Sequence, residues 1–336
     1  MLHERSSRIS FCAWRRVQML DLGSIEPRQI PALRIAGGSS PGCFAPLRLA
    51  VKELLVQRGF ALLRNTGVID AESFSSTIAE LGIATAVHYG DLPDEGWPGV
   101  FRTTQYPPSE SIFFHSEASH MARAPRLIAF GCIQPALAGG ATPLSDNFLA
   151  LSTLRPEISR ALQSEGLCYE RAFIPGLDVL WQNFFRTDDR AKAMERGIAE
   201  GLTLQWDNDD VLCTVSRRPA TLSRANGQSC LFQQIALHHP VFLDPDLRTE
   251  MADICGGRMP RNVTLGSGAP LPDSWAIAIH DSQCRAAFTF SWESGDVLIV
   301  DNVRTSHARA PFVGPRHHIV MVSPLSANLS ESEINI

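Results

Sequence analysis

The sequence predicts a mainly β fold with flanking helices, an antiparallel double-stranded β-helix of the jelly-roll (cupin-like) kind. Strand-like runs cluster early and late in the chain, and they do not alternate regularly with helices as a doubly wound parallel sheet would require. Hydrophobic residues make up 44% of the 336 positions and charged residues 19%, which is ordinary for a globular protein and excludes intrinsic disorder. The sequence contains no internal repeat and no interdomain linker, so we expect one elaborated domain over 21–330.

The first elements expected along the chain are a helix and a buried strand. Residues 44–57 place four aliphatic side chains on one helical stripe, and Gly59 follows as a stop signal. The apolar run 60–65 predicts a short buried strand. The N-terminus has basic residues but no apolar stretch of useful length, so it does not predict a secretory signal. We expect residues 1–20 to form a flexible tail.

Further strands and helices follow from the same kind of pattern. Four apolar runs predict strands, and they lie at 112–117, 126–133, 296–302 and 318–322. Two polar stretches between them predict helices, at 147–163 and 188–201. Long loops in compact domains often carry function. We therefore expect three loops to form a lid and specificity surface, near 89–111, 171–187 and 256–274.

The net charge and the cysteines limit which partners the protein is expected to bind and in which compartment it is expected to work. The formal net charge is −5, so nothing in the whole-chain charge favours binding to nucleic acid or an anionic membrane. No run of 18 apolar residues exists that would predict a membrane span. The eight cysteines include no C-x-x-C pair, so a zinc ribbon or a thioredoxin-type motif is not expected. Scattered cysteines in a chain of this length indicate reduced thiols and a cytoplasmic protein.

Two histidines and a carboxylate form the candidate metal site. His115 and Glu117 end the apolar run 112–117, and residues i and i+2 of an extended strand point to the same face. With ten histidines in the chain, such a pair also arises by chance. His307 follows the buried strand 296–302 and offers a third ligand. Two histidines and one carboxylate leave three coordination positions open, which suits a non-haem Fe(II) oxygenase.

Residues close to this set offer a site for an organic acid. Arg309 and Arg316 follow His307, and an arginine near the metal would hold a far carboxylate of a co-substrate through a paired hydrogen bond. A glycine turn at 139–140 leads to Thr142, which offers a hydroxyl just after the strand 126–133. Asp301-Asn302 is expected to satisfy turn backbone near the metal.

Taken together, these stretches resemble the taurine dioxygenase-like (TauD/TfdA) superfamily of Fe(II)/2-oxoglutarate-dependent oxygenases. The resemblance is to its H-x-E branch, which includes clavaminate synthase-like enzymes and amino-acid β-hydroxylases of non-ribosomal peptide pathways. It implies His115, Glu117 and His307 as iron ligands. It also implies Arg316 as the partner of the distal carboxylate of 2-oxoglutarate, helped by Thr142, with Arg309 as the alternative. The matching segments are 113–120, 125–147, 181–190, 258–262 and 292–316.

The resemblance implies an enzyme that uses O2 and releases succinate and CO2. It would hydroxylate, desaturate or cyclise at an unactivated C–H of an amino acid or amino-acid-derived metabolite, in secondary metabolism, with the substrate free or tethered to a carrier protein. Because Glu117 completes the ligand set, the resemblance favours hydroxylation over halogenation. Two alternatives are a metal-dependent cupin-type isomerase or hydrolase that does not use 2-oxoglutarate, and a catalytically silent binding relative.

Polar residues in the matching segments are candidates for substrate binding. Each could equally belong to a buried hydrogen-bond network. These candidates are Gln182, Asn183, Thr187, Gln233 and Arg309.

Overall fold

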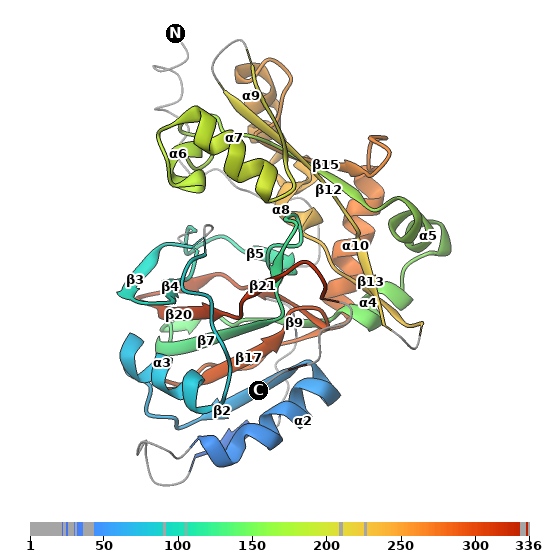
Figure 1. The fold of residues 1–336 in the computed structure, drawn as a ribbon. Helices are drawn as coiled ribbons and strands as arrows, with labels where there is room; N and C mark the ends of the chain where they lie inside the picture. The colour runs from blue at the N-terminus through green and yellow to red at the C-terminus, as the bar shows by residue number, and fades with distance from the viewer. Residues whose placement is uncertain are drawn as a thin grey trace.

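The computed structural model describes residues 22, 25, 30, 32–35, 44–89, 92–104, 106–207, 211–224, 227–329 and 334. The tail expected over 1–20 lies outside these residues. In Figure 1 a strand-rich sandwich occupies the lower half of the molecule, and a third sheet with further helices lies above it. None of the helices in the described part of the chain is long and apolar enough to cross a membrane.

The larger sheet of the sandwich has seven strands. They are β1 (Ala32–Arg34), β2 (Phe60–Arg64), β3 (Asp94–Trp97), β4 (Val100–Arg102), β7 (Leu127–Gln134), β17 (Val297–Asp301) and β20 (His317–Val322). Their spatial order is β1-β2-β17-β7-β20-β4-β3, and only the β1–β2 pair is parallel. All five residues of β17 are buried, because it lies inside the sheet and its apolar side chains pack on both faces.

The smaller sheet has four strands. They are β5 (Ile112–His115), β9 (Leu144–Asp146), β16 (Ala287–Phe288) and β18 (Thr305–Arg309). Their order is β16-β9-β18-β5, and all three pairings are antiparallel. Side chains of both sheets line one cavity, so the two sheets face each other across it. This arrangement confirms the jelly-roll fold that the sequence predicts.

Two helices cover the outer face of the larger sheet (Figure 1). They are α2 (Arg48–Arg58) and α3 (Ala71–Glu80), and their buried side chains join those of β2, β7 and β17 in one apolar cluster. Helix α2 ends at Gly59, whose φ of +81° is left-handed. A Cβ at Gly59 would lie 2.2 Å from Thr305 Oγ1, so only glycine fits between the helix end and β18.

The middle of the chain forms a third sheet, which the sequence analysis largely missed. Its strands are β10 (Leu167–Ala172), β11 (Thr203–Trp206), β12 (Leu212–Arg218) and β15 (Arg261–Leu265), in the order β11-β12-β10-β15. The expectation of a loop over 256–274 is therefore wrong at β15. That strand is short and follows a Gly- and Pro-containing stretch, and its pairing with β10 defines it.

Two more segments expected to be loops contain regular structure, and one expected helix is divided. Strands β3 and β4 pair as a hairpin inside 89–111, and α6 (Trp181–Phe185) lies inside 171–187. The helix expected over 147–163 is two helices, α4 (Asn147–Ser152) and α5 (Pro156–Glu165). Pro156 lacks an N–H and favours the first turn of a helix, so α4 ends before it and α5 begins at it.

The remaining elements complete the fold. They are η2 (Ala45–Leu47), β6 (Ala124–Pro125), β8 (Ala138–Gly139), α7 (Arg190–Ala199), β13 (Thr221–Ser223), β14 (Ser229–Leu231), α8 (Ile235–His238), η3 (Pro240–Phe242), α9 (Pro245–Ile254), α10 (Asp273–Arg285), β19 (Phe312–Val313) and β21 (Leu325–Ser326).

Candidate active site

The three residues expected to bind a metal lie together on the smaller sheet. His115 is the last residue of β5, and the antiparallel pairing of β5 with β18 places His307 directly opposite it. Glu117 follows two residues after His115. One ligand atom from each of the three side chains lies within 4.8 Å of the other two. Cross-strand register therefore builds the cluster, and the two imidazole ring centroids are 4.3 Å apart.

Hydrogen bonds orient these side chains so that their ligand atoms converge. The Nδ1–H of His115 donates to the carbonyl oxygen of Phe113 at 2.8 Å, which leaves its Nε2 lone pair free. Tyr89 donates its hydroxyl to Oε1 of Glu117. The other carboxylate oxygen, Oε2, lies 3.5 Å from Nε2 of His115 and 3.9 Å from Nε2 of His307. Three lone-pair donors thus face one small space.

The electrostatic surroundings keep Glu117 and His307 in their ligating protonation states. Burial raises the pKa of Glu117, but the hydrogen bond and charge of His115 and the charge of His307 outweigh it, so the pKa falls to about 2. Burial lowers the pKa of His307 to about 3, with the nearby His115 adding to the effect. At neutral pH Glu117 is an anion and His307 is a neutral base, which are the forms that coordinate a cation.

The backbone of Glu117 is fixed by Asn302, at the end of β17. Asn302 accepts from the Glu117 N–H at 2.7 Å and donates to the Glu117 carbonyl at 3.0 Å and to the Pro125 carbonyl at 2.9 Å. The expectation that this turn satisfies backbone near the metal is confirmed, and here the backbone is that of a candidate ligand.

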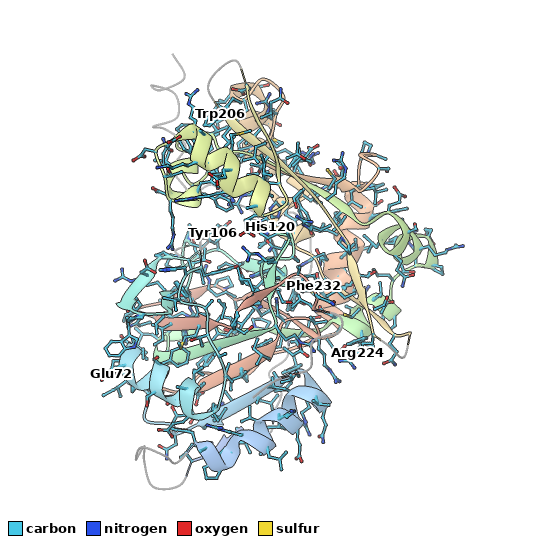
Figure 2. All side chains as sticks on the ribbon, viewed as in Figure 1. Glu72, Tyr106, His120, Trp206, Arg224 and Phe232 are labelled. Atoms are coloured by element: carbon cyan, nitrogen blue, oxygen red, sulfur yellow. The ribbon has the colours of Figure 1, made fainter. Side chains whose placement is uncertain are left out.

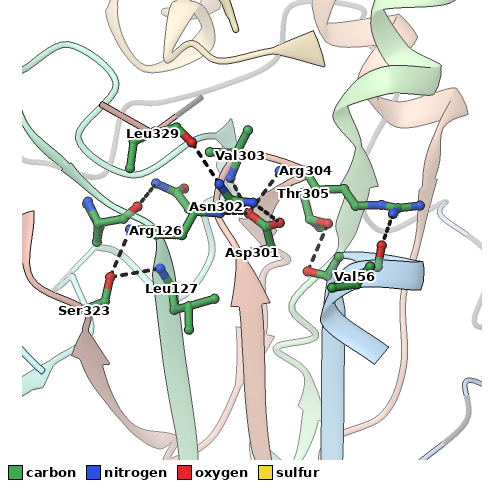
Figure 3. A network of polar contacts seen from close by, with 12 residues as sticks. Val56, Arg126, Leu127, Asp301, Asn302, Val303, Arg304, Thr305, Ser323 and Leu329 are labelled. Atoms are coloured by element: carbon green, nitrogen blue, oxygen red, sulfur yellow. Dashed lines mark hydrogen bonds and ion pairs between the residues drawn. The ribbon is translucent and has the colours of Figure 1, made fainter. Parts of the chain in front are cut away.

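The neighbouring Asp301 extends this support across the larger sheet, as Figure 3 shows. Its Oδ1 accepts from the Val303 N–H at 3.1 Å, and its Oδ2 accepts from the Arg126 guanidinium at 2.9 Å. Arg126 also donates to the carbonyl of Leu329 at 2.8 Å. The turn that carries Asn302 is thus tied to β7 and to the C-terminal segment.

This donor set fits a non-haem Fe(II) ion. It combines two imidazole nitrogens and one carboxylate oxygen, and no fourth His, Cys, Asp or Glu joins the cluster among the described residues. A set of this kind holds iron on one side and leaves the other side open to small molecules.

A cavity between the two sheets extends from this cluster to Arg316. Its apolar walls include Ile128 and Phe130 from β7 and Val320 and Val322 from β20. Burial and the charge of Arg309 lower the pKa of Arg316 to about 10, which still leaves it charged at neutral pH. The remaining lining residues are Leu92, Thr103, Thr104, Ile112, His115, Glu117, Thr142, Trp292, His307, Ala308, Arg309 and His318.

Arg316 and Thr142 supply further polar groups of the cavity lining. The Nε–H of Arg316 donates to the Gly140 carbonyl at 3.3 Å, and its guanidinium lies 5.5 Å from the ring centroid of Phe312. No carboxylate pairs with it among the described residues. Thr142 Oγ1 accepts from the Trp292 Nε1–H at 3.1 Å, and its own hydroxyl hydrogen is left for another acceptor.

Arg309, the alternative partner for an acid, is already occupied. Its two terminal nitrogens donate to the carbonyl oxygens of Tyr106, Pro107 and Glu110, at 2.6 to 3.0 Å. These bonds fasten the loop 106–110 to β18. The geometry therefore favours Arg316 over Arg309 as the residue available to a ligand.

Comparison with known proteins agrees with this site. The family model described as "Taurine catabolism dioxygenase TauD, TfdA family" matches residues 39–322. The chain belongs to this family. With its two-histidine, one-carboxylate cluster, this member of the TauD/TfdA family is an Fe(II)/2-oxoglutarate-dependent oxygenase, as the sequence analysis predicted.

Two curated proteins are similar to this TauD/TfdA member over most of their length. The dapdiamide synthesis protein DdaC of Enterobacter agglomerans is 29% identical over 287 residues, covering 84% of this chain and 87% of that protein. A clavaminate synthase-like protein of Arabidopsis thaliana is 27% identical over 282 residues, covering 78% and 81%. The fold is similar to a crystal structure of AAD-2 in complex with Mn(II) and N-oxalylglycine, with a TM-score of 0.51, 11% identity, and coverage of 92% of this chain and 96% of that chain.

The other candidates for substrate binding lie apart from this cavity. Gln182 and Asn183 are on α6, and the Thr187 hydroxyl accepts from the Asp189 N–H at 3.2 Å. Gln233 is 1% exposed, donates to Gln283 at 3.1 Å and accepts from the Ile235 N–H, so it belongs to a buried network. None of these four residues lines the cavity.

Several residues of the site were given no role in the sequence analysis. Tyr89 contacts Glu117, and Trp292, expected only as a core residue, donates to Thr142. His318 lines the cavity from β20. The signal that could have found it is its place two residues after Arg316.

Proposed function

We propose that His115, Glu117 and His307 hold Fe(II), and that Arg316 and Thr142 bind 2-oxoglutarate. The observation that carries this proposal is the arrangement of the cavity. Three converging lone-pair donors lie at one end, and a half-buried arginine with no carboxylate partner among the described residues lies toward the other. A ligand that spans them needs a chelating end for the metal and a carboxylate for the arginine, and 2-oxoglutarate has both.

When bound, iron and 2-oxoglutarate supply the O2 activation that oxidises a C–H bond, with succinate and CO2 as co-products. The chain supplies orientation and a dry site. Tyr89 and Asn302 hold Glu117 in place, and the Phe113 carbonyl fixes the His115 tautomer. The apolar walls from Ile128, Phe130 and Val320 exclude water from the space in front of the ligands.

We infer that the substrate is a small amino acid or amino-acid-derived metabolite, free or carrier-tethered, and that the enzyme acts in secondary metabolism. A similar protein is named for dapdiamide synthesis, which supports a biosynthetic role. Thr103 and Thr104 add two hydroxyl groups to the cavity lining. The complete ligand triad favours hydroxylation, desaturation or cyclisation. We also infer a cytoplasmic enzyme, since all six described cysteines are free thiols.

The test is an anaerobic titration of the apo protein with Fe(II) and then 2-oxoglutarate, followed by visible absorption. Chelation of the iron by the co-substrate is expected to produce a weak charge-transfer band, and candidate amino acids are then screened by how they perturb it. Bound iron without such a band would overturn the co-substrate assignment and favour an isomerase or hydrolase. Absence of iron binding would overturn the ligand assignment and favour a silent relative.

Carrier tethering is tested separately. Each amino acid that perturbs the band is offered free and as its thioester on a carrier protein, and product is measured by mass spectrometry. Turnover of the thioester alone would establish a tethered substrate, and turnover of the free acid alone would exclude one.

A further inference from the structure

His318 is a buried polar residue in the cavity that the roles proposed above leave unexplained. It lies on β20 with only 3% of its surface exposed, and it lines the same cavity as Arg316 and Thr142. Arg316 lies just before β20, and both Arg316 and His318 line the cavity. The intervening His317 points the other way, where it is exposed and bonds to Glu95 at 2.8 Å.

Both ring nitrogens of His318 are buried and lack a hydrogen-bond partner among the described residues. Two other buried histidines each have a hydrogen-bond partner. His238 Nδ1 bonds to the Gln234 carbonyl at 3.1 Å, and His239 Nε2 bonds to the Leu271 carbonyl at 2.9 Å. A buried polar group without a partner carries its full desolvation penalty. Such a group on a cavity wall is therefore suited to a ligand.

The surroundings of His318 select an anion with hydrogen-bond acceptors. Its ring packs on Trp292, with centroids 4.8 Å apart, and Trp292 in turn donates to Thr142. Burial and the positive charge of Arg316 lower the pKa of His318 well below its ordinary value, so the ring is neutral and offers one N–H. Cys132 on β7 is the strand partner of His318. It is a buried neutral thiol, because burial raises its pKa to about 12. No carboxylate occupies this end of the cavity among its lining residues.

We propose that His318 is a second ligand of the distal carboxylate of 2-oxoglutarate, donating one N–H to it beside Arg316. This inference rests on the proposed function, because it assumes that 2-oxoglutarate occupies the cavity. Arg316 supplies the charge, and His318 supplies a further directed donor to the same cavity. The bound carboxylate then satisfies the ring nitrogen that the folded chain leaves unpaired.

The experiment compares two chelating acids on three proteins. Protein loaded with Mn(II), which resists oxidation, is titrated calorimetrically with 2-oxoglutarate and with 2-oxobutanoate, which has the chelating end but no distal carboxylate. His318→Leu is compared with the wild type and with the matched control His317→Leu, one residue away on the opposite face. His318→Leu is expected to weaken 2-oxoglutarate roughly 10- to 100-fold, as for loss of a hydrogen bond to a charged group. Affinity for 2-oxobutanoate should change less than about twofold, since its complex never used that bond.

Other outcomes separate the inference from the proposed function. Unchanged 2-oxoglutarate affinity in His318→Leu, or an equal loss for both acids, would overturn the role of His318. A wild-type protein that binds Mn(II) but not 2-oxoglutarate would overturn the proposed function itself. His318→Gln keeps an N–H donor and should recover most of the lost affinity, whereas a purely apolar packing role would be better rescued by His318→Met. Thermal unfolding of each variant checks its fold, and His318→Met replaces His318→Leu if the latter does not fold.

Discussion

The two ends of the cavity differ in how completely the chain itself satisfies their polar groups. At the metal end, Glu117 is held by Tyr89 and Asn302, and His115 by the Phe113 carbonyl. At the co-substrate end, Arg316 has a single bond to the Gly140 carbonyl, and His318 has none among the described residues. The metal end is largely held by the chain, with Nδ1 of His307 left without a partner among the described residues, and the other end has two donor side chains still to be satisfied.

The two ends therefore have different requirements. The metal end needs precise geometry, and the co-substrate end needs affinity for its ligand. A metal centre needs its ligands fixed within a few tenths of an ångström, so the surrounding hydrogen bonds must exist in advance. A carboxylate site gains affinity when the ligand supplies acceptors that the folded chain does not. Variants at the metal end should therefore lose iron, and variants at the co-substrate end should lose affinity for 2-oxoglutarate alone.

The largest effect is expected for the proposed iron ligands. His307→Ala removes one of three donor atoms at the metal end, so iron binding and turnover should both be lost. Iron content after anaerobic reconstitution and desalting measures this loss. His88→Ala, at an exposed histidine outside the cavity, is the control and should retain iron. Wild-type iron content in His307→Ala would show that the metal is held elsewhere.

Arg316→Leu should come next, and it should affect only the co-substrate end. Loss of the charged partner of a buried carboxylate typically costs enough to weaken binding by at least about 100-fold. Calorimetry of the Mn(II)-loaded variant measures the affinity for 2-oxoglutarate, and metal content should stay at the wild-type level. Arg316→Lys keeps the charge but lacks the planar guanidinium, so its affinity for 2-oxoglutarate should lie between those of the wild type and Arg316→Leu. A variant that loses metal as well would contradict the division between the two ends.

Asn302→Ala tests the support of the metal end without touching a ligand atom. It removes the amide that bonds to both the N–H and the carbonyl of Glu117, so iron affinity should fall roughly 10- to 100-fold. The free energy of unfolding should also fall, by about 1–3 kcal/mol. Ser323→Ala is the matched control, because Ser323 accepts from the buried N–H groups of Arg126 and Leu127, away from the ligands (Figure 3). If both variants lose iron equally, the effect is one of general stability.

The smallest effect is expected for Thr142→Val, which keeps the shape of the side chain and removes the hydroxyl. The affinity for 2-oxoglutarate should fall a few-fold, in the range of one neutral hydrogen bond. Trp292 also loses its acceptor, so its fluorescence should change in the ligand-free protein. Thr142→Ser should restore the affinity. If Thr142→Val binds 2-oxoglutarate as tightly as the wild type, the hydroxyl of Thr142 serves only as the acceptor for Trp292.

The upper part of the molecule shows where local sequence patterns carried less information. Figure 2 places His120 between the lower sandwich and the upper helices, and Trp206 among those helices. The strands there are short, and β11 alternates between exposed and half-buried residues, so no long apolar run marks it. The central strands β7 and β17 were predicted almost to the residue, because burial on both faces demands a continuous apolar run.

The sequence by itself determined the fold class, the strands that cross the core and the residue types of the metal site. His115, Glu117, His307, Thr142 and Arg316 were all named from spacing and resemblance, and the structure brings them to one cavity. Each of these signals is local, since a buried strand or a glycine turn leaves its mark within a few residues.

Only the tertiary structure decided which side chains support these residues and which are left for a ligand. The register of β5 against β18 sets His307 opposite His115, and the fold brings Asn302 to the backbone of Glu117. The same packing turned Arg309 to the loop 106–110 and left His318 unpaired in the cavity. Contacts between residues far apart in the chain depend on strand register and on the whole fold, and no local pattern encodes them.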